Sequence, residues 1–222
     1  MTMISTNEAP LARALTSDRR GRAAIPAGKR MLDIAVSALM LLILSPLMLV
    51  TALAVKLTSP GPVFFVQTRV GLNGQTFGMI KFRSMYRDAE ARRAALLAQS
   101  DRGGVCFKQK NDPRVTSVGR IIRRYSIDEL PQLINVLKGD MSLVGPRPAL
   151  PSEVAAYPAH ALGRLAALPG ITGVWQVSGR ADVSFDQMVE MDIAYARSVS
   201  LRRDLAVLLL TIPAVLSGRG AY

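Results

Sequence analysis

Two adjacent carboxylates, Asp128 and Glu129, lie between basic residues in the middle of the chain. Arg123 precedes the pair, and Arg147 follows it inside a Pro-Arg-Pro segment. A carboxylate can serve as a nucleophile or as a magnesium ligand, and an arginine can bind two phosphate oxygens at once. Because the flanking prolines restrict the backbone, the guanidinium of Arg147 would lose little freedom on binding. These four residues form a candidate site for phosphate chemistry.

The acid pair also fits a simpler pattern, in which Ser126 and Glu129 form a capping box at the start of a helix. Pro131 argues against that register, because it would fall inside the helix, where its ring clashes with the preceding turn. The proline fits the first turn of a helix that starts between Asp128 and Leu130. On this register the acids lie at a turn beside the positive helix end, which would keep Asp128 ionised.

Further basic residues lie in a predicted β-hairpin. Two runs that alternate apolar and polar residues, 63–70 and 75–83, flank Asn73-Gly74, which is a strong hairpin signal. Lys81 and Arg83 alternate with Phe82, so they would share one face of a strand and could bind phosphate. The alternative is an ordinary solvated face.

Composition narrows the function classes. With 222 residues the chain suits one main domain, and its net charge of +12 accompanies a hydrophobic content of 50%. This combination indicates a basic protein on an anionic membrane surface that handles anionic substrates. Aromatic residues make up only 5%, and no zinc-finger or RNA-recognition signature is present, which argues against a nucleic-acid partner. Single residues, Cys106 and His160, offer neither an internal disulfide nor a metal cluster.

Residues 34–55 contain no charged side chain and are long enough to cross a bilayer, which takes roughly 20 residues. Lysines and arginines lie on both sides of this run, so the positive-inside rule puts both flanks in the cytoplasm. Ser45-Pro46 lies in its middle, where proline removes a backbone bond and the serine hydroxyl can satisfy a freed carbonyl. We therefore expect a re-entrant helix-break-helix. The alternative, a straight spanning helix with a tolerated kink, would place everything after Leu57 across the membrane.

Several short motifs follow one another along most of the chain. They are Lys29-Arg30-x-x-Asp33, Ser45-Pro46, Gly61-Pro62-Val63-Phe64-Phe65, Lys81-Phe82-Arg83-Ser84-Met85, Asp112-Pro113-Arg114, Asp128-Glu129-Leu130-Pro131-Gln132, Gly145-Pro146-Arg147-Pro148, Pro169-Gly170-Ile171-Thr172-Gly173 and Asp192-x-x-Tyr195. By these motifs the chain from Lys29 onward resembles the bacterial sugar transferases, the monotopic phosphoglycosyl transferases that begin exopolysaccharide and related envelope glycans. Many larger members carry several spanning helices before the catalytic region. The sequence predicts none of these helices here, so we expect the compact catalytic form.

The resemblance implies a reaction. A UDP-sugar and undecaprenyl phosphate would give undecaprenyl-diphosphate-sugar and UMP, with Mg²⁺ as cofactor. Asp128 matches the nucleophile that forms a covalent phosphosugar intermediate, and Glu129 matches its partner, with both acids as candidate metal ligands. Phosphate contacts would come from a basic set whose division of roles stays open. That set is Lys81, Arg83, Arg123 and Arg147.

The composition and residue patterns, together with the resemblance, predict an architecture. Residues 1–28 would form a flexible tail, residues 29–59 a re-entrant membrane helix broken at Ser45-Pro46, and residues 60–222 a cytoplasmic catalytic domain. The expected fold is mixed α/β and mainly α, with a short β-hairpin and interfacial helices. Residues 201–216 fit either an interfacial helix or a buried core helix.

The expected location is the cytoplasmic face of the bacterial inner membrane, in contact with its lipid. The partners would be a UDP-sugar donor and undecaprenyl phosphate, while galactose, glucose and N-acetylated sugars stay open as the sugar. Monomer and homo-oligomer stay open as well. The competing hypothesis is a non-catalytic basic membrane module, in which Asp128 and Glu129 merely start a helix.

Overall fold

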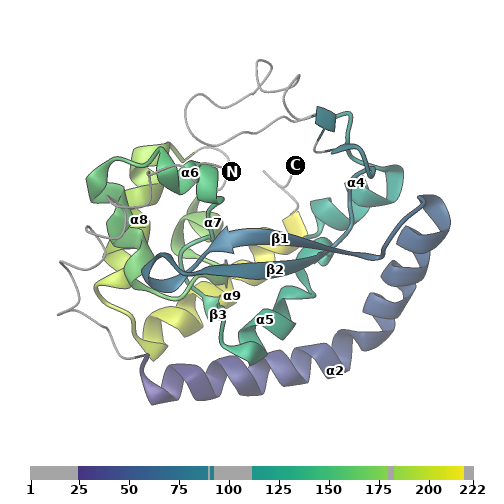
Figure 1. Ribbon diagram of the computed structural model, residues 1–222. Coiled ribbons are helices and arrows are strands. Elements are labelled where there is room, and N and C mark those ends of the chain that lie inside the picture. Colours follow the sequence, from purple (N-terminus) through teal and green to yellow (C-terminus); the bar gives the residue numbers. More distant parts are fainter. Residues whose placement is uncertain (1–24, 90, 93–111, 180–182, 218–222) are drawn as a thin grey trace, which may run out of the picture.

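The computed structural model describes residues 25–89, 91–92, 112–179 and 183–217 (Figure 1). Most of the expected N-terminal tail, and Cys106, lie outside the described residues. The described chain is mixed α/β and mainly helical, as expected, with two small sheets.

The apolar run forms one long helix, α2 (Ala27–Thr58). It is the one helix of the described residues that is long and apolar enough to cross a membrane. The expected break is replaced by a continuous helix that bends along its length and stays helical through Pro46 (Figure 1). Proline at this position cannot donate to the carbonyl of Leu42, and the hydroxyl of Ser45 donates to that carbonyl instead, at 2.8 Å. The local chemistry expected of Ser45-Pro46 is therefore present without an interruption of the helix.

The predicted hairpin is confirmed. Strands β1 (Phe64–Val70) and β2 (Thr76–Phe82) pair in antiparallel register, with Phe65 opposite Lys81. The connecting turn, η2 (Leu72–Gly74), has left-handed backbone angles at Asn73 and Gly74, with φ of 54° and 79°. Asparagine and glycine tolerate these angles best, which is why this dipeptide turns the chain here.

A second sheet lies deeper in the domain, where β3 (Ser142–Val144) runs parallel to β4 (Gly170–Thr172). Short helical elements surround both sheets. They are α4 (Ser117–Arg124), η4 (Ile127–Glu129), α5 (Gln132–Lys138), α6 (Pro151–Ala155), η5 (Ala159–Ala166), α7 (Val174–Ser178), α8 (Phe185–Ala196) and α9 (Leu201–Ser217).

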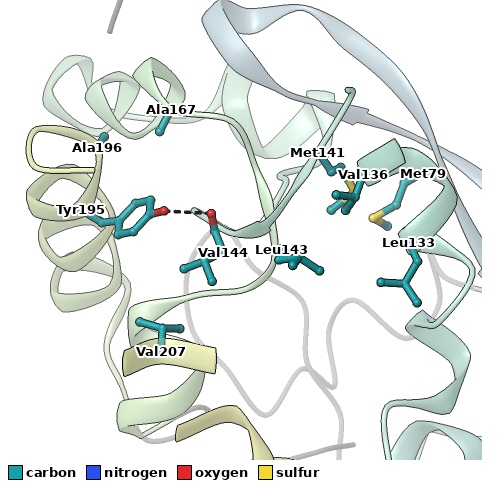
Figure 2. Packing of buried hydrophobic residues seen from close by; sticks show 10 residues of the cluster. All are labelled: Met79, Leu133, Val136, Met141, Leu143, Val144, Ala167, Tyr195, Ala196 and Val207. Atoms are coloured by element: carbon teal, nitrogen blue, oxygen red, sulfur yellow. Dashed lines mark hydrogen bonds between the residues drawn. The ribbon is translucent and has the colours of Figure 1, made fainter. Parts of the chain in front are cut away.

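The main core lies between α5, β3, α8 and α9 (Figure 2). Val136 and Met141 are fully buried there, and Val207 of α9 packs against the same cluster. The opposite face of α9 exposes apolar side chains, among them Leu209 and Leu216. Residues 201–216 therefore combine a face that is buried in the core with an apolar face that is open to the surroundings.

Polar contacts attach the first turns of α2 to this core. Lys29 forms a buried ion pair with Asp204 of α9, with 2.7 Å between Nζ and Oδ2. Asp33 accepts hydrogen bonds from the hydroxyl of Ser142 and the amide of Leu143, both at 3.0 Å. Arg30 donates to two carbonyls at the end of α5. The N-terminal part of α2 is thus fixed to α5, α9 and strand β3.

Candidate active site

The acid pair lies in a tight turn between two helices. Ser126 has left-handed backbone angles, with φ of 56°, and its side chain makes no capping hydrogen bond within the described chain. Asp128 and Glu129 form the single turn η4, and α5 begins only after Pro131. The capping-box alternative is therefore wrong, and the acids lie at a turn before a helix as predicted, but the helix begins at Gln132 rather than between Asp128 and Leu130.

Glu129 lies among cations. Its Oε1 atom is 2.7 Å from Nζ of Lys81 on strand β2 and 3.5 Å from both terminal nitrogens of Arg147. Burial disfavours the charged carboxylate, but Lys81 and Arg147 outweigh this effect and hold the pKa of Glu129 at about 2. Burial likewise lowers the pKa of Lys81, and the charge of Glu129 opposes that change. Glu129 is therefore charged at neutral pH as a member of a buried ion pair.

Asp128 differs from its neighbour. Its residue is only 8% exposed, and its carboxylate accepts no hydrogen bond from any residue that the structure describes. Burial raises the pKa of Asp128 to about 6, although the positive charge of Lys81 opposes the rise. The positive helix end therefore does not lower the pKa of Asp128, because desolvation is the larger effect, but a carboxyl group with a pKa of about 6 is still largely ionised at pH 7. The result is a buried carboxylate with unused oxygen lone pairs beside several cations.

The other predicted cations separate into two groups. Arg123, at the end of α4, is close enough to lower the pKa of Asp128, so it belongs to the site. Arg83 does not face the acids. Its guanidinium is buried and donates to the carbonyls of Pro60 and Ser59, at 2.6 and 2.7 Å, beyond the end of α2. The expectation that Arg83 binds phosphate is corrected, because strand β2 ends at Phe82 and the alternation of faces ends with it.

Arg69 was not among the predicted site residues. It lies on β1 and, by the register of the hairpin, on the same face as Lys81. Together with Lys81, Glu129 and Arg147 it lines a shallow hollow at the surface. One guanidinium nitrogen of Arg69 donates to the carbonyl of Pro148 at 3.0 Å. Strict alternation along the predicted strand would have placed Arg69 on this face.

The two acids are the candidate magnesium ligands. No group of three or more candidate ligand side chains occurs among the described residues. Magnesium, however, commonly takes one or two carboxylates and fills its remaining positions with water and substrate phosphate. The carboxylate of Asp128, which is free of hydrogen bonds from described residues, and the second oxygen of Glu129 fit that requirement.

Comparison with known proteins agrees with this site. The family model for "Bacterial sugar transferase" matches residues 25–218. The "Galactosyl transferase CpsE" of Streptococcus agalactiae is 49% identical over 162 residues, covering 72% of this chain but only 36% of CpsE. The "Exopolysaccharide production protein ExoY" of Rhizobium meliloti is 41% identical, covering 87% of this chain and 88% of ExoY.

A third relative is named for a different sugar. The "UDP-glucose:undecaprenyl-phosphate glucose-1-phosphate transferase" of Caulobacter vibrioides is 43% identical, covering 90% of this chain and 74% of that protein. The family-model match, residues 25–218, includes both the acid pair and the hairpin. On the strength of a family match over nearly its whole length, the chain belongs to the bacterial sugar transferases.

Proposed function

We propose that the chain transfers a sugar-1-phosphate from a UDP-sugar to undecaprenyl phosphate and releases UMP, as the first membrane step of exopolysaccharide or related glycan synthesis. The proposal is supported by relatives whose names include exopolysaccharide production and undecaprenyl-phosphate transfer. The observation that carries it is the state of Asp128, a buried carboxylate without hydrogen bonds from described residues and with cations around it.

The reaction takes two displacements at phosphorus. First, a carboxylate oxygen of Asp128 attacks the sugar-bearing phosphorus of the UDP-sugar, and the bond to the UMP oxygen breaks with its electron pair. This leaves an acyl phosphate on Asp128 that carries the sugar. Next, a phosphate oxygen of undecaprenyl phosphate attacks the same phosphorus, and the bond to Asp128 breaks. The carboxylate is restored, and no proton is consumed in either step.

The basic residues answer a specific electrostatic problem. A carboxylate that approaches an anionic phosphoryl group is repelled, so nearby fixed cations must compensate. Arg147 is 39% exposed in its side chain, so it can turn part of its guanidinium toward a phosphate while it remains near Glu129. Lys81 and Arg123 reduce the energy of the ionised form of Asp128. In our proposal Asp128 and Glu129 would hold Mg²⁺, which would supply further neutralisation of phosphate charge.

The membrane arrangement forms part of the same proposal. The bend of α2 and the basic residues on both of its flanks support a re-entrant helix at the cytoplasmic face of the inner membrane (Figure 1). Cysteines placed singly at Gly28 and Lys56, in a Cys106→Ser background, test it with an impermeant thiol reagent. A re-entrant helix allows labelling of both positions only from the cytoplasmic side. Labelling of the two positions from opposite sides would show a spanning helix instead.

The reaction is tested by measuring UMP release from purified protein in nanodiscs with magnesium, undecaprenyl phosphate and a panel of UDP-sugars. We expect release with at least one donor and none from Asp128→Asn. Asp186→Asn, an exposed carboxylate on α8, is the matched control and should behave as wild type. A donor labelled at the sugar-bearing phosphate should leave the label on the Asp128 peptide after acid quenching. Wild-type protein that binds lipid but releases no UMP would favour the membrane-module hypothesis.

A further inference from the structure

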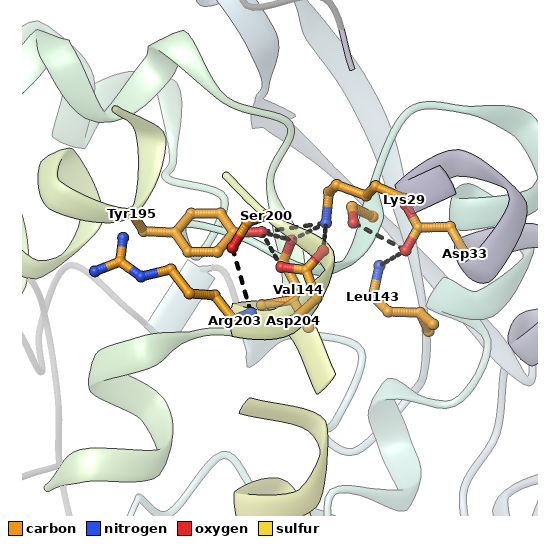
Figure 3. Close-up of polar contacts among 9 residues, drawn as sticks. Lys29, Asp33, Leu143, Val144, Tyr195, Ser200, Arg203 and Asp204 are labelled. Atoms are coloured by element: carbon orange, nitrogen blue, oxygen red, sulfur yellow. Dashed lines mark hydrogen bonds and ion pairs between the residues drawn. The ribbon is translucent and has the colours of Figure 1, made fainter. Parts of the chain in front are cut away.

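The backbone that carries Arg147 is held by side chains from distant parts of the chain. Residues 144–147 connect the end of strand β3 to Arg147, whose side chain contacts Glu129. At the first of them, the carbonyl of Val144 lies 3.0 Å from Nζ of Lys29 and 2.9 Å from the hydroxyl of Tyr195 (Figure 3). At the last, the carbonyl of Arg147 itself accepts a hydrogen bond from Arg164 at 3.3 Å. Both ends of this short segment therefore have side-chain anchors.

Both anchors involve helix α8, although Lys29 of α2 also contributes to the first. Tyr195 belongs to α8, and Asp192 lies one turn before it on the same buried side. Asp192 holds Arg164, with 2.5 Å between Oδ2 and the guanidinium nitrogen, and the two side chains are 2% and 3% exposed. A buried ion pair is costly unless both charges are fully engaged. The Asp192–Arg164 pair contacts the backbone of Arg147 through Arg164, and the chemistry at Asp128 does not explain why a buried ion pair lies there.

The hydroxyl of Tyr195 belongs to a second buried group. It accepts from Lys29 at 3.1 Å and has one proton to donate, with the carbonyl of Val144 and Oδ1 of Asp204, at 2.7 Å, both in reach (Figures 2 and 3). Burial, with Asp204 beside it, raises the pKa of Tyr195, so the phenol keeps its proton. The phenol can donate this proton to only one of the two acceptors at a time, while Lys29 also donates to the carbonyl of Val144.

The backbone between the anchors has little room to move. The amide of Gly145 donates to the carbonyl of Thr172 at 2.9 Å, and a Cβ at Gly145 would lie 2.2 Å from the carbonyl oxygen of Leu168. The chain therefore passes close against strand β4. With both ends anchored, the remaining freedom at Arg147 is the rotation of its own side chain.

We propose that Tyr195 and the Asp192–Arg164 pair are positioning residues that fix the guanidinium of Arg147 relative to Glu129, and that they act on phosphate transfer only through Arg147. The inference rests on the proposed function for its kinetic consequence. Arg147 reaches Glu129 with both nitrogens at 3.5 Å, a loose pair that a small shift of the backbone would break. Displacements on the scale of an ångström are enough to slow catalysis strongly.

The test uses two mild variants. Arg164→Lys keeps the charge beside Asp192 but shortens the reach to the Arg147 carbonyl, and Tyr195→Phe removes one hydroxyl. Thr211→Val is the matched control, because it removes a half-buried hydroxyl on α9 that bonds Thr172 and does not touch residues 144–147. We expect both test variants to lower kcat/KM for UMP release by about tenfold, the value of one lost hydrogen bond. Thr211→Val should change it less than twofold.

A double-variant comparison separates positioning from general damage. In an Arg147→Ala background, Arg164→Lys should have no further effect on kcat/KM, since its route of action is already lost. If the losses multiply, Arg164 acts independently of Arg147 and the inference is wrong. Unfolding temperatures of all variants, measured in parallel, correct the activities for the folded fraction.

A second readout does not need turnover. Phenylglyoxal modifies accessible arginines, and the rate of modification of Arg147 can be followed by mass spectrometry of its peptide. Arg164→Lys and Tyr195→Phe should accelerate that rate several-fold, while Thr211→Val should not. Unchanged rates in both test variants would overturn the inference even if the wild type releases UMP. Absence of UMP release by the wild type, with the expected change in modification rate, would reject the proposed function alone.

Discussion

Lys81 and Glu129 form an ion pair with 2.7 Å between Nζ and Oε1. This contact distinguishes Glu129 from its neighbour Asp128, whose pKa shifts in the opposite direction. Glu129 accepts the hydrogen bond of the lysine and stays charged. Asp128 interacts with the charge of Lys81 but accepts no hydrogen bond from it. Two carboxylates adjacent in sequence thus have pKa values pushed in opposite directions, which is how one site can hold a fixed charge and a reactive group together.

The first prediction concerns pH. Without bound Mg²⁺ the pKa of Asp128 is raised to about 6, and the attacking form is the carboxylate, so at limiting Mg²⁺ the kcat/KM for UMP release should increase with pH up to about 6 and then level off. Arg147 lowers this pKa, so Arg147→Gln should move the rise to higher pH. A pH series of initial rates at low UDP-sugar concentration measures both. Because the acids interact, the observed value belongs to the pair. A flat profile between pH 5 and 8 at limiting Mg²⁺ would contradict the assignment of Asp128 as nucleophile.

The second prediction is that Asp128→Asn stabilises the fold at neutral pH. The folded chain holds this proton more tightly than the unfolded chain does, so its stability decreases as pH rises between about 4 and 6. A rise from 3.8 to about 6 corresponds to about 3 kcal/mol at pH 7. The variant should therefore unfold at higher temperature than wild type at pH 7, and at nearly the same temperature at pH 4. Thermal unfolding at both pH values in nanodiscs checks the prediction, and equal midpoints at pH 7 would count against it.

The third prediction is that Glu129→Gln destabilises the fold at neutral pH, the opposite of the effect expected for Asp128→Asn. Glu129 has its pKa lowered from 4.5 to about 2, so its ionised form contributes stability above pH 4.5 that is lost as pH falls toward 2. Glu129→Gln removes about 3 kcal/mol of this contribution at pH 7 and leaves Lys81 buried without its partner. Its unfolding temperature should fall below that of wild type, and the difference should shrink in acid. Asp186→Asn serves again as the exposed control, with an unchanged midpoint.

Local chemistry explains which features the sequence could predict. Asn73-Gly74 determines the hairpin turn through its own backbone angles, and Pro131 excludes the capping-box register without help from the rest of the fold. The contact of Ser45 with the freed carbonyl of Leu42 is local too. In each case the decisive atoms lie within a few residues of one another, so spacing in the sequence carries the information.

Other features depend on contacts between distant segments. The raised pKa of Asp128 comes from burial against β2, which no pattern around residue 128 reveals. Lys29 and Asp33 belong to one sequence motif, but their partners in β3 and α9 lie more than a hundred residues away. No pattern around Arg164 in the sequence indicates that it pairs with Asp192. The two residues are 28 positions apart, and only the tertiary packing brings Arg164 to the motif Asp192-x-x-Tyr195.

Arg83 gives the last prediction, because its contacts separate a structural arginine from a phosphate-binding one. Its guanidinium donates to the carbonyls of Pro60 and Ser59 and to the hydroxyl of Ser59, which joins the end of α2 to the start of the hairpin. A lysine in its place keeps the charge but cannot reproduce the forked geometry. Arg83→Lys should therefore lower stability by about 2 kcal/mol, as expected for lost hydrogen bonds to a charged group, and leave the KM for the UDP-sugar within about twofold of wild type.

Arg147→Lys is the matched comparison and should do the reverse, raising KM with little change in unfolding temperature, since Arg147 is half-exposed and loosely paired. Steady-state kinetics and thermal unfolding on the same preparations distinguish the two variants. If Arg83→Lys raised KM as strongly as Arg147→Lys while its unfolding temperature stayed unchanged, Arg83 would have to reach the substrate, and the end of α2 would need another anchor.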